Sequence, residues 1–361
     1  MPFSYYRSVT VDHTLVPSTQ TDFPLLVSFT HDDLRTVGNG GNVQHSSAYD
    51  VGFFSDAGLS SALFWEMEEY DPTTGKVVAW VKISSLSSSV DTVIYVGYGD
   101  SSISSFQSTV SSVWDSDYEG VWHFKSGFTS ALSTTDSTTN NNALASAGSY
   151  TSASGQINGG ASQGGSSYMN LGSNKPLDGL TAFTLEAYLY NQNGGSAKAF
   201  MSDWTSRQLL WRNETTNQLR LLVEWTDATS DTSGYSPSGY AANVWTKVVA
   251  TYDGTTLRTY SNAVAGPTVS VSGKTIKTSA STTNFGGGPV GSEDYWVGGL
   301  DEFRISRIAR SANWISAEYA NQNSPGTFFA LGSEQVIASG QPALRRMATV
   351  PFLGGSRARA F

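Results

Sequence analysis

The hydrophobic positions of the first 100 residues fall in short runs and show no helical period. Turn-forming Gly, Pro, Asp and Ser separate these runs, and residues 71–75 place Pro and Gly where a hairpin needs them. The runs at 76–83 and 92–98 are rich in β-branched and aromatic residues, which favours strands. The predicted strands cover residues 23–29, 49–54, 62–70, 76–83 and 92–98.

Similar strand patterns return in the second half of the chain. They lie at 183–190, 219–225 and 245–252, at the spacing of a β-sandwich. The stretch 126–167 before them is polar and rich in Ser, Thr, Asn and Gly. Because periodic strands follow it, we interpret it as long loops across a β scaffold.

One short helix is predicted after these strands. Ser311 is a candidate N-cap, and the residues after it place Trp314 and Glu318 four positions apart on one face. The helix is expected to end near residues 321–325, and a last strand to follow at 328–332.

The Ser-rich segments 84–89 and 101–112 read as loops, and the second precedes a new pattern near Asp115. A length of 361 residues agrees with two domains. The chain is therefore predicted to be all-β, with an N-terminal β-sandwich-like domain. The predicted division is 1–105 for that domain, 113–337 for a second β domain and 338–361 for a basic extended arm.

The composition excludes several function classes. The chain has no cysteine, which excludes disulfide frameworks, cysteine-ligated zinc, iron–sulfur clusters and thiol nucleophiles. No apolar run approaches the roughly 18 residues of a membrane-spanning helix. A net charge of −9 argues against a protein that coats nucleic acid.

The charge is unevenly distributed. Residues 1–105 hold 4 Lys and Arg against 12 Asp and Glu, whereas residues 338–361 hold 4 Arg and no acid. Because apolar side chains lie among these arginines, we expect the segment to dock on a partner surface and to become ordered there. The alternative is that it folds back onto its own acidic domains. The expected docking residues are Arg345, Arg346, Phe352, Arg357, Arg359 and Phe361.

Residues 115–335 resemble a laminin-G-like, concanavalin A-like jelly roll. The resemblance implies a jelly-roll fold with a binding or structural role, and sugars as the usual ligand class. The matching motifs appear in the family's order, at 120–124, 136–142, 168–172, 183–188, 245–254 and 299–306.

Residues 4–100 resemble an uncharacterised β domain that precedes such jelly rolls in bacterial surface and phage proteins. The matching pieces lie at 6–11, 50–54, 80–83 and 94–99. The run 314–325 is similar to the end of those tandem proteins. The resemblance leaves the function open, because one fold serves many functions.

Concanavalin A-like folds also host glycosidases, whose retaining members need two carboxyl groups about 5–5.5 Å apart. No stretch matches the Glu-x-Asp-x-(x)-Glu motif of those enzymes. The nearest spacing, at 66–71, lies in the first domain and is interpreted as a solvated strand face. Asp301 and Glu302 are adjacent, so on a regular strand they point to opposite faces. We therefore expect no enzymatic activity.

Calcium is the one metal that the resemblance implies, and no cofactor is expected to be required. Many laminin-G-like jelly rolls bind calcium at positions that correspond to Asp136, Asn140 and Asp301. Here threonines at 138–139 stand where the family usually has a Gly. The alternative is an Asx-turn loop and an Asp that is bonded to backbone amides.

Sugar binding needs flat aromatic faces that are exposed in loops. The alternative role for aromatic residues beside loops is to cover hydrophobic edges or a protein interface. The candidates that flank predicted loops are Trp204, Trp211, Tyr235, Tyr240, Tyr295 and Trp296.

These observations favour a non-catalytic phage virion protein on the particle surface: a capsid decoration, a head fibre or a tail-associated adhesin. Its expected partners are other virion proteins, copies of itself and host cell-surface glycans, and neither nucleic acid nor a membrane. The first residues carry no secretory leader. Either a leader was removed before residue 1, or the protein reaches a cytoplasmically assembled particle without one. The alternatives are a secreted or surface-anchored bacterial carbohydrate-binding protein, and a glycosidase or lyase with an unrecognised site.

Overall fold

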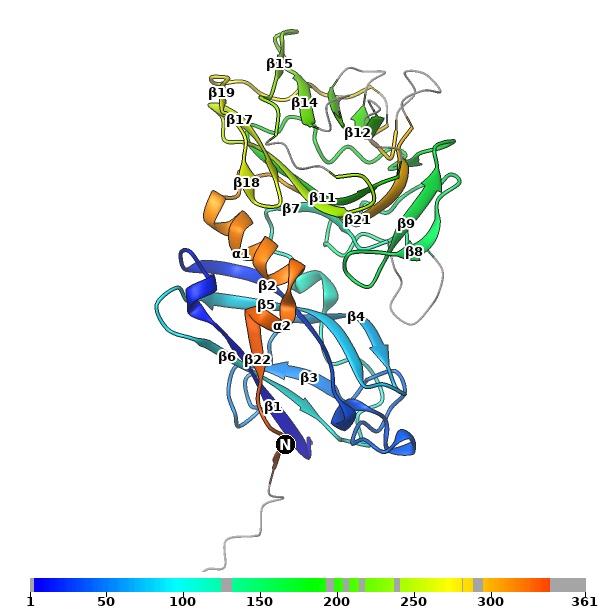
Figure 1. Cartoon of the computed structure of the whole chain (residues 1–361), viewed down its shortest axis with the longest axis vertical. Helices are drawn as coiled ribbons and strands as arrows, with labels where there is room; N and C mark the ends of the chain where they lie inside the picture. Colours follow the sequence, from blue (N-terminus) through cyan, green and yellow to red (C-terminus); the bar gives the residue numbers. More distant parts are fainter. Residues whose placement is uncertain are drawn as a thin grey trace, which may run out of the picture.

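The computed structural model describes residues 3–124, 132–192, 198–203, 208–213, 218–236, 241–280, 282–287 and 295–337. It confirms a chain built mainly of β-strands in two domains, stacked along the long axis of the molecule with helix α1 (Ala312–Asn323) beside their junction (Figure 1). The strands and the helix that the sequence predicts are present. In the described part of the chain, no helix is long and apolar enough to cross a membrane.

The N-terminal domain is a sandwich of two antiparallel sheets. One sheet has the order β22–β1–β6–β3, with β23 also paired to β1, and the other has the order β2–β5–β4. Alternating residues of β1 and β2, such as Val9, Val11, Phe23 and Leu25, are fully buried between the sheets. The strands are β1 (Tyr5–Val11), β2 (Gln20–Thr30), β3 (Val51–Phe54), β4 (Trp65–Asp71), β5 (Lys76–Leu86), β6 (Thr92–Tyr98), β22 (Phe329–Leu331) and β23 (Gln335–Val336). Short 3-10 turns lie at η1 (His13–Leu15), η2 (Asp32–Leu34), η3 (Val37–Asn39) and η4 (Val110–Ser112).

The C-terminal end of the described chain completes this first domain. Strand β22 pairs with β1, and α1 together with α2 (Pro325–Phe328) places Trp314 and Phe328 in the first domain's core. The side chain of Asn321 accepts a hydrogen bond from the backbone N–H of Leu26 at 2.7 Å and donates one to its carbonyl at 2.9 Å. Residues 312–337 therefore differ from the predicted division, which assigned them to the second domain. The physical reason is that β22 and β23 pair with β1, which would otherwise be an open sheet edge, and the helices before them pack on the same domain.

The second domain is a jelly roll of two facing sheets. The larger sheet has the order β18–β17–β16–β11–β21–β9–β8, with β19 paired to β17 and β7 paired to β21. The smaller sheet has the order β10–β20–β12–β13–β14–β15. Between them lies a core rich in aromatic side chains. The larger sheet contains β7 (Tyr118–Trp122), β8 (Thr151–Ser154), β9 (Gly159–Gly164), β11 (Phe183–Asn191), β16 (Trp245–Tyr252), β17 (Thr256–Ser261), β18 (Val264–Ala265), β19 (Val269–Ser270) and β21 (Val297–Ser306). The smaller contains β10 (Met169–Asn170), β12 (Lys198–Asp203), β13 (Leu209–Asn213), β14 (Leu219–Glu224), β15 (Ser230–Thr232) and β20 (Asn284–Phe285).

A β-bulge in β21 changes the direction of its carboxylates. Glu302 has a positive φ of 51°, and the register with β11 shifts at this point. Leu300 and Phe303 both face the jelly-roll core, so the two residues between them, Asp301 and Glu302, lie on the opposite face. The prediction that these two carboxylates point to opposite faces is therefore wrong, because the bulge inserts one extra residue into the alternation.

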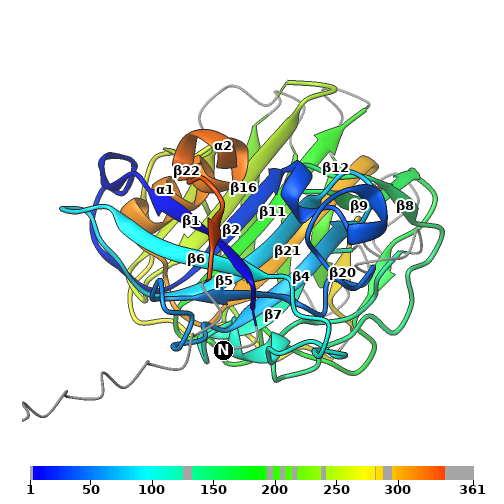
Figure 2. The same cartoon turned by 90° about the horizontal axis from the view of Figure 1, so that it is seen from below.

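The two domains pack through the outer faces of their sheets. Leu26 and Trp80 of the first domain and Val121 and Tyr188 of the second belong to one buried apolar cluster. Seen from below, β2 and β5 lie across β11 and β21 (Figure 2). Trp114, from the segment that joins the domains, is buried in the same cluster. The two domains therefore share a buried apolar interface in addition to the segment that joins them.

This arrangement predicts the outcome of limited proteolysis. Residues 101–112 form a mostly exposed segment and should be cut first. The two fragments should stay together on native gel filtration, because residues 312–337 are held in the first domain's core, and should separate only in denaturant. Separate elution of the fragments under native conditions would contradict the arrangement.

Candidate functional site

Two of the predicted sugar-binding aromatics are core residues. Trp211 and Trp296 are fully buried, and their rings pack on Phe200 with centroids 4.7 and 5.7 Å away. The indole N–H of Trp296 donates to the carbonyl of Gly299 at 3.1 Å. Neither indole offers a face to a ligand in solvent, so their assignment to sugar binding is corrected. Trp211 lies in β13 and faces inward from it, whereas Trp296 precedes β21 and its ring packs into the core from there.

Two other candidates lie at the surface of the jelly roll. Tyr235 is 46% exposed, and the guanidinium of Arg220 lies 5.9 Å from its ring centroid. Tyr295 is half-buried and stacks on Tyr168, with centroids 6.2 Å apart and an interplanar angle of 18°. The remaining candidates, Trp204 and Tyr240, lie outside the described residues, as do Arg345, Arg346, Phe352, Arg357, Arg359 and Phe361.

Asp136, the first predicted calcium ligand, is engaged with its own loop. Its carboxylate accepts hydrogen bonds from the backbone N–H groups of Val121, Thr138 and Asn142 at 2.7–2.9 Å. The Asn140 side chain donates to the carbonyl of Tyr118 at 3.0 Å. These contacts form the Asx-turn loop that the sequence left as the alternative.

Asp301, the third predicted ligand, is buried at the domain interface. Its carboxyl accepts a hydrogen bond from the backbone N–H of Ile157 at 2.9 Å. Burial and the neighbouring Glu302 raise its pKa well above the usual range. No hydrogen bond among the described residues joins Asp301 to Asp136, and calcium binding stays a prediction.

A buried ionic cluster occupies the domain interface and is centred on Arg304. Its guanidinium donates at 2.6 Å to Glu302 and at 2.6 Å to Glu318 of α1. It lies over two neighbouring indole rings, 4.4 Å from the centroid of Trp80 and 4.8 Å from that of Trp114. These pairs join the jelly roll, the joining segment and the first domain.

Two further cations extend this cluster. His123 lies 2.6 Å from Glu302 through Nδ1 and 3.4 Å from Glu66 through Nε2. Lys247 of β16 pairs with Glu318 at 2.7 Å and with Glu186 at 3.0 Å. The ionic cluster therefore contains Arg304, His123 and Lys247 with the carboxyl groups of both domains.

The carboxylates of β4 belong to this cluster as well. Glu66 accepts from the indole N–H of Trp114 at 2.9 Å, and Glu68 accepts from that of Trp80 at 2.9 Å. The side chain of Glu68 is 2% exposed. The interpretation of these residues as a solvated strand face is thus wrong for Glu66 and Glu68. A register shift between Met67 and Glu69 accompanies their placement at the interface.

Burial and neighbouring charges shift the pKa values of the cluster's side chains in different directions. Burial, reinforced by Glu302, raises the pKa of Glu68 to about 8. Burial also opposes ionisation of Glu318, but Lys247 and Arg304 outweigh it and hold its pKa at about 2. Burial disfavours the charge on His123, but Glu302 and Glu66 raise its pKa well above the usual value. The cluster therefore carries protons on selected carboxyls and approaches charge balance.

Two groups among the described residues bring carboxylate and imidazole atoms within 4.8 Å of one another. One is Glu68, His123 and Glu302, whose carboxylates already bind Trp80 and Arg304. The other, at the surface, is Asp12, His13 and Asp91. These are the described side chains that have the donors and the spacing to hold a metal ion.

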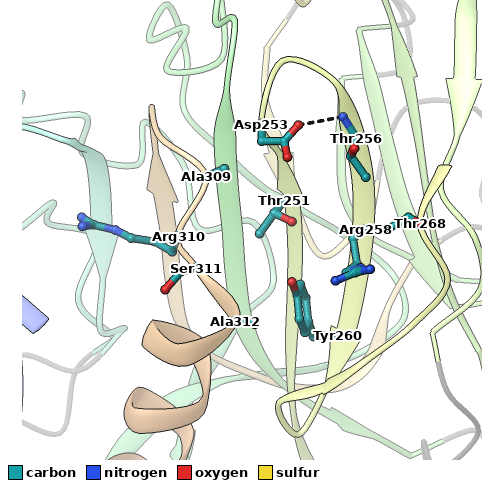
Figure 3. Close-up of a pocket in the computed structure, with 10 residues that line it drawn as sticks. All are labelled: Thr251, Asp253, Thr256, Arg258, Tyr260, Thr268, Ala309, Arg310, Ser311 and Ala312. Carbon is teal, nitrogen blue, oxygen red and sulfur yellow. Dashed lines mark hydrogen bonds between the residues drawn. The ribbon is translucent and has the colours of Figure 1, made fainter. Parts of the chain in front are cut away.

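A polar pocket of about 380 Å³ opens on the outer face of the larger sheet (Figure 3). Strand β17 contributes Arg258 and Tyr260, and the loop between β16 and β17 contributes Asp253. The N-cap and first residue of α1, Ser311 and Ala312, line the other side. These residues are not among the predicted site residues. The alternation of 256–261 could have indicated them, because Leu257 faces the core and its neighbour Arg258 therefore faces away.

Comparison with known families agrees with the fold. Residues 163–316 match the concanavalin A-like lectin/glucanases superfamily. Residues 47–127 match a domain of unknown function, DUF2341. The chain therefore contains an N-terminal DUF2341 domain followed by a concanavalin A-like domain, which confirms both resemblances. Among curated proteins, none matches the chain in sequence.

Three solved structures are among those with similarity to the chain. The binding domain of Paraclostridial Mosquitocidal Protein 1 is 11% identical with a TM-score of 0.47, and the match covers 56% of this chain and 52% of that one. Domain 4 of AbnA, a GH43 extracellular arabinanase from Geobacillus stearothermophilus in complex with arabinotriose, is 14% identical with a TM-score of 0.46, covering 56% and 98%. The CBM40 of Ruminococcus gnavus IT-sialidase bound to α2,3 sialyllactose is 12% identical with a TM-score of 0.39, covering 44% and 95%. The chain thus spans about half of the length of the mosquitocidal protein's domain.

The raised pKa of Glu68 predicts a pH-dependent stability. A carboxyl whose pKa is raised from 4.5 to about 8 on folding stabilises the native state fully below its unfolded pKa. This contribution is lost as the pH rises through 8. The free energy of unfolding of the wild type should therefore fall, by a few kcal/mol, relative to that of Glu68→Gln between pH 5 and pH 8.5.

Urea unfolding across this pH range measures the effect. Glu69→Gln, which removes a carboxylate from the same strand, serves as the matched control. Parallel pH profiles for the wild type and Glu68→Gln would show that Glu68 does not hold a proton in the native state.

Proposed function

We propose that this protein is a non-catalytic carbohydrate-binding protein, exposed on the surface of a phage virion, in which the jelly roll recognises a glycan. The observation that carries the proposal is the ring of Tyr295, which is stacked on Tyr168 at the surface of a concanavalin A-like domain. Such a ring offers an apolar face for the C–H face of a sugar. Tyr235, beneath Arg220, is a second exposed ring of the same domain.

The placement of the interface carboxyls supports a role without catalysis. Asp301 and Glu302 lie on one face of β21, as a glycosidase pair would, but both are buried against the first domain. His123 and Arg304 pair with Glu302. A polysaccharide would have to separate the domains to reach these groups.

Display on a particle is supported by the position of the chain's ends. The backbone N–H of Ile337 donates to the carbonyl of Ser4 at 2.8 Å, so the described chain ends beside its start. Both lie at the pole of the molecule opposite the jelly roll (Figure 1). The basic segment 338–361 follows from this pole. Attachment there directs the jelly roll away from the attachment surface.

The glycan proposal predicts the behaviour of one variant on a glycan array. The wild type should retain at least one glycan, and Tyr295→Ala should weaken that binding by about tenfold, the loss expected for one stacked ring. Tyr95→Ala removes a half-buried tyrosine of the first domain and should bind like the wild type. If the wild type retains no glycan on an array of neutral and acidic sugars, the proposed function is wrong.

The absence of catalysis predicts a negative result in a sensitive assay. Incubation of the protein with bacterial polysaccharides should release no reducing ends. Reproducible release that disappears on Glu→Gln substitution at a jelly-roll position would establish a hydrolase instead.

Attachment through the C-terminal segment predicts the effect of a deletion. Removing residues 340–361 should leave both domains folded, with an unchanged circular dichroism spectrum, and abolish assembly or incorporation into particles. Wild-type occupancy of the truncated chain would rule out this segment as the attachment.

A further inference from the structure

The pocket on the outer face of the larger sheet contains a cation with no partner. Arg258 is half-buried, and its guanidinium makes no hydrogen bond or ion pair with any residue that the structure describes. Its Nε atom is buried and has no hydrogen-bond partner. Leaving a buried donor unpaired is unfavourable. Arg304 and Arg310 of the same domain, by contrast, each pair with a carboxylate.

The N-terminus of α1 adds a second positive feature to the same pocket. Ser311 and Ala312 line it. The Ser311 hydroxyl accepts from the backbone N–H of Trp314 at 3.1 Å, which satisfies one of the helix's first donors. The other first-turn N–H groups have no intrahelical acceptor, and the helix dipole places partial positive charge at this end. Arg310 points away from the pocket, toward Asp115 (Figure 3).

The other end of the pocket is built to accept hydrogen bonds. Asp253 lies at the far end from Tyr260 in Figure 3 and is held by the backbone N–H groups of Thr255 at 2.8 Å and Thr256 at 2.7 Å. Its negative charge would repel an anion placed beside it. The hydroxyl of Thr251 lies between the two ends. An anionic group is thus directed toward Arg258, and neutral hydroxyls toward Asp253.

We propose that this pocket binds a carboxylate-bearing sugar residue of an acidic saccharide. The carboxylate pairs with the guanidinium fork of Arg258, and the sugar hydroxyls donate to Asp253 and contact Thr251. A volume of about 380 Å³ fits one sugar residue. The inference rests on the proposed function and adds the ligand class and a second contact site, on a different part of the jelly roll from Tyr295.

The test compares each acidic oligosaccharide with its own methyl ester, which keeps the sugar and removes the charge. The probes are tetragalacturonate, a hyaluronan tetrasaccharide and sialyllactose, titrated by calorimetry into the full chain. The wild type should bind at least one acid at least about tenfold more tightly than its ester, the size of a charge-assisted hydrogen-bond pair. The preference should shrink with added salt.

Arg258→Gln should abolish the preference, so that the acid binds no more tightly than its ester, and Arg258→Lys should keep part of it. Lys277→Gln removes a positive charge elsewhere in the jelly roll, where Lys277 pairs with Glu224, and should behave like the wild type. Melting curves confirm that the variants fold. The inference is overturned if no acid is preferred over its ester, or if Arg258→Gln keeps the preference. If neutral glycans still bind in those cases, only the inference is wrong and the proposed function is retained. If no glycan binds at all, both the inference and the proposed function are wrong.

Discussion

The pairing of Arg304 with Glu302 and Glu318 holds the parts of this molecule in their places. The arginine belongs to the jelly roll, Glu318 belongs to a helix that packs on the first domain, and the flanking indoles come from β5 and the joining segment. A buried charge must be paired and hydrogen-bonded to be tolerated. Removal of one partner leaves the other as an unpaired charge in a low-dielectric environment. Each element of the ionic cluster therefore depends on the others being folded.

Charge balance explains how so many carboxyls share one buried interface. Glu302 and Glu318 stay ionised beside their cations, whereas burial raises the pKa of Glu68 to about 8 and keeps a proton on it at neutral pH. The same principle applies to Asp301, whose pKa is raised by burial and by the neighbouring Glu302. Only some carboxyls of the ionic cluster are ionised. Because the cluster is buried and its ion pairs connect both domains, it acts as a cross-link between them.

The sequence predicts the elements well and their partners poorly. Ser311 and the spacing after it predict α1, because capping and periodicity are local properties. They show that one face of the helix is apolar but not which domain covers it. Trp314 packs in the first domain's core, and Ile315 packs against the jelly roll. The alternation of strand residues predicted the wrong direction for the Glu302 side chain, because a β-bulge lies there. The bulged residue with positive φ is a glutamate, so no glycine in the sequence marks the bulge. Trp211 and Trp296 lie beside loops in the sequence, yet their rings complete the core, since a position near a loop does not determine the side that a ring faces.

The fixed junction gives the candidate binding surfaces a defined direction. With α1 held by Arg304 and Lys247, its N-terminus stays against the larger sheet beside Arg258, and the jelly roll cannot swing on the joining segment. Differential scanning calorimetry of the full chain tests this coupling most directly. We expect one transition whose calorimetric and van't Hoff enthalpies agree, as for a single cooperative unit. Two resolved transitions, one for each domain, would contradict it.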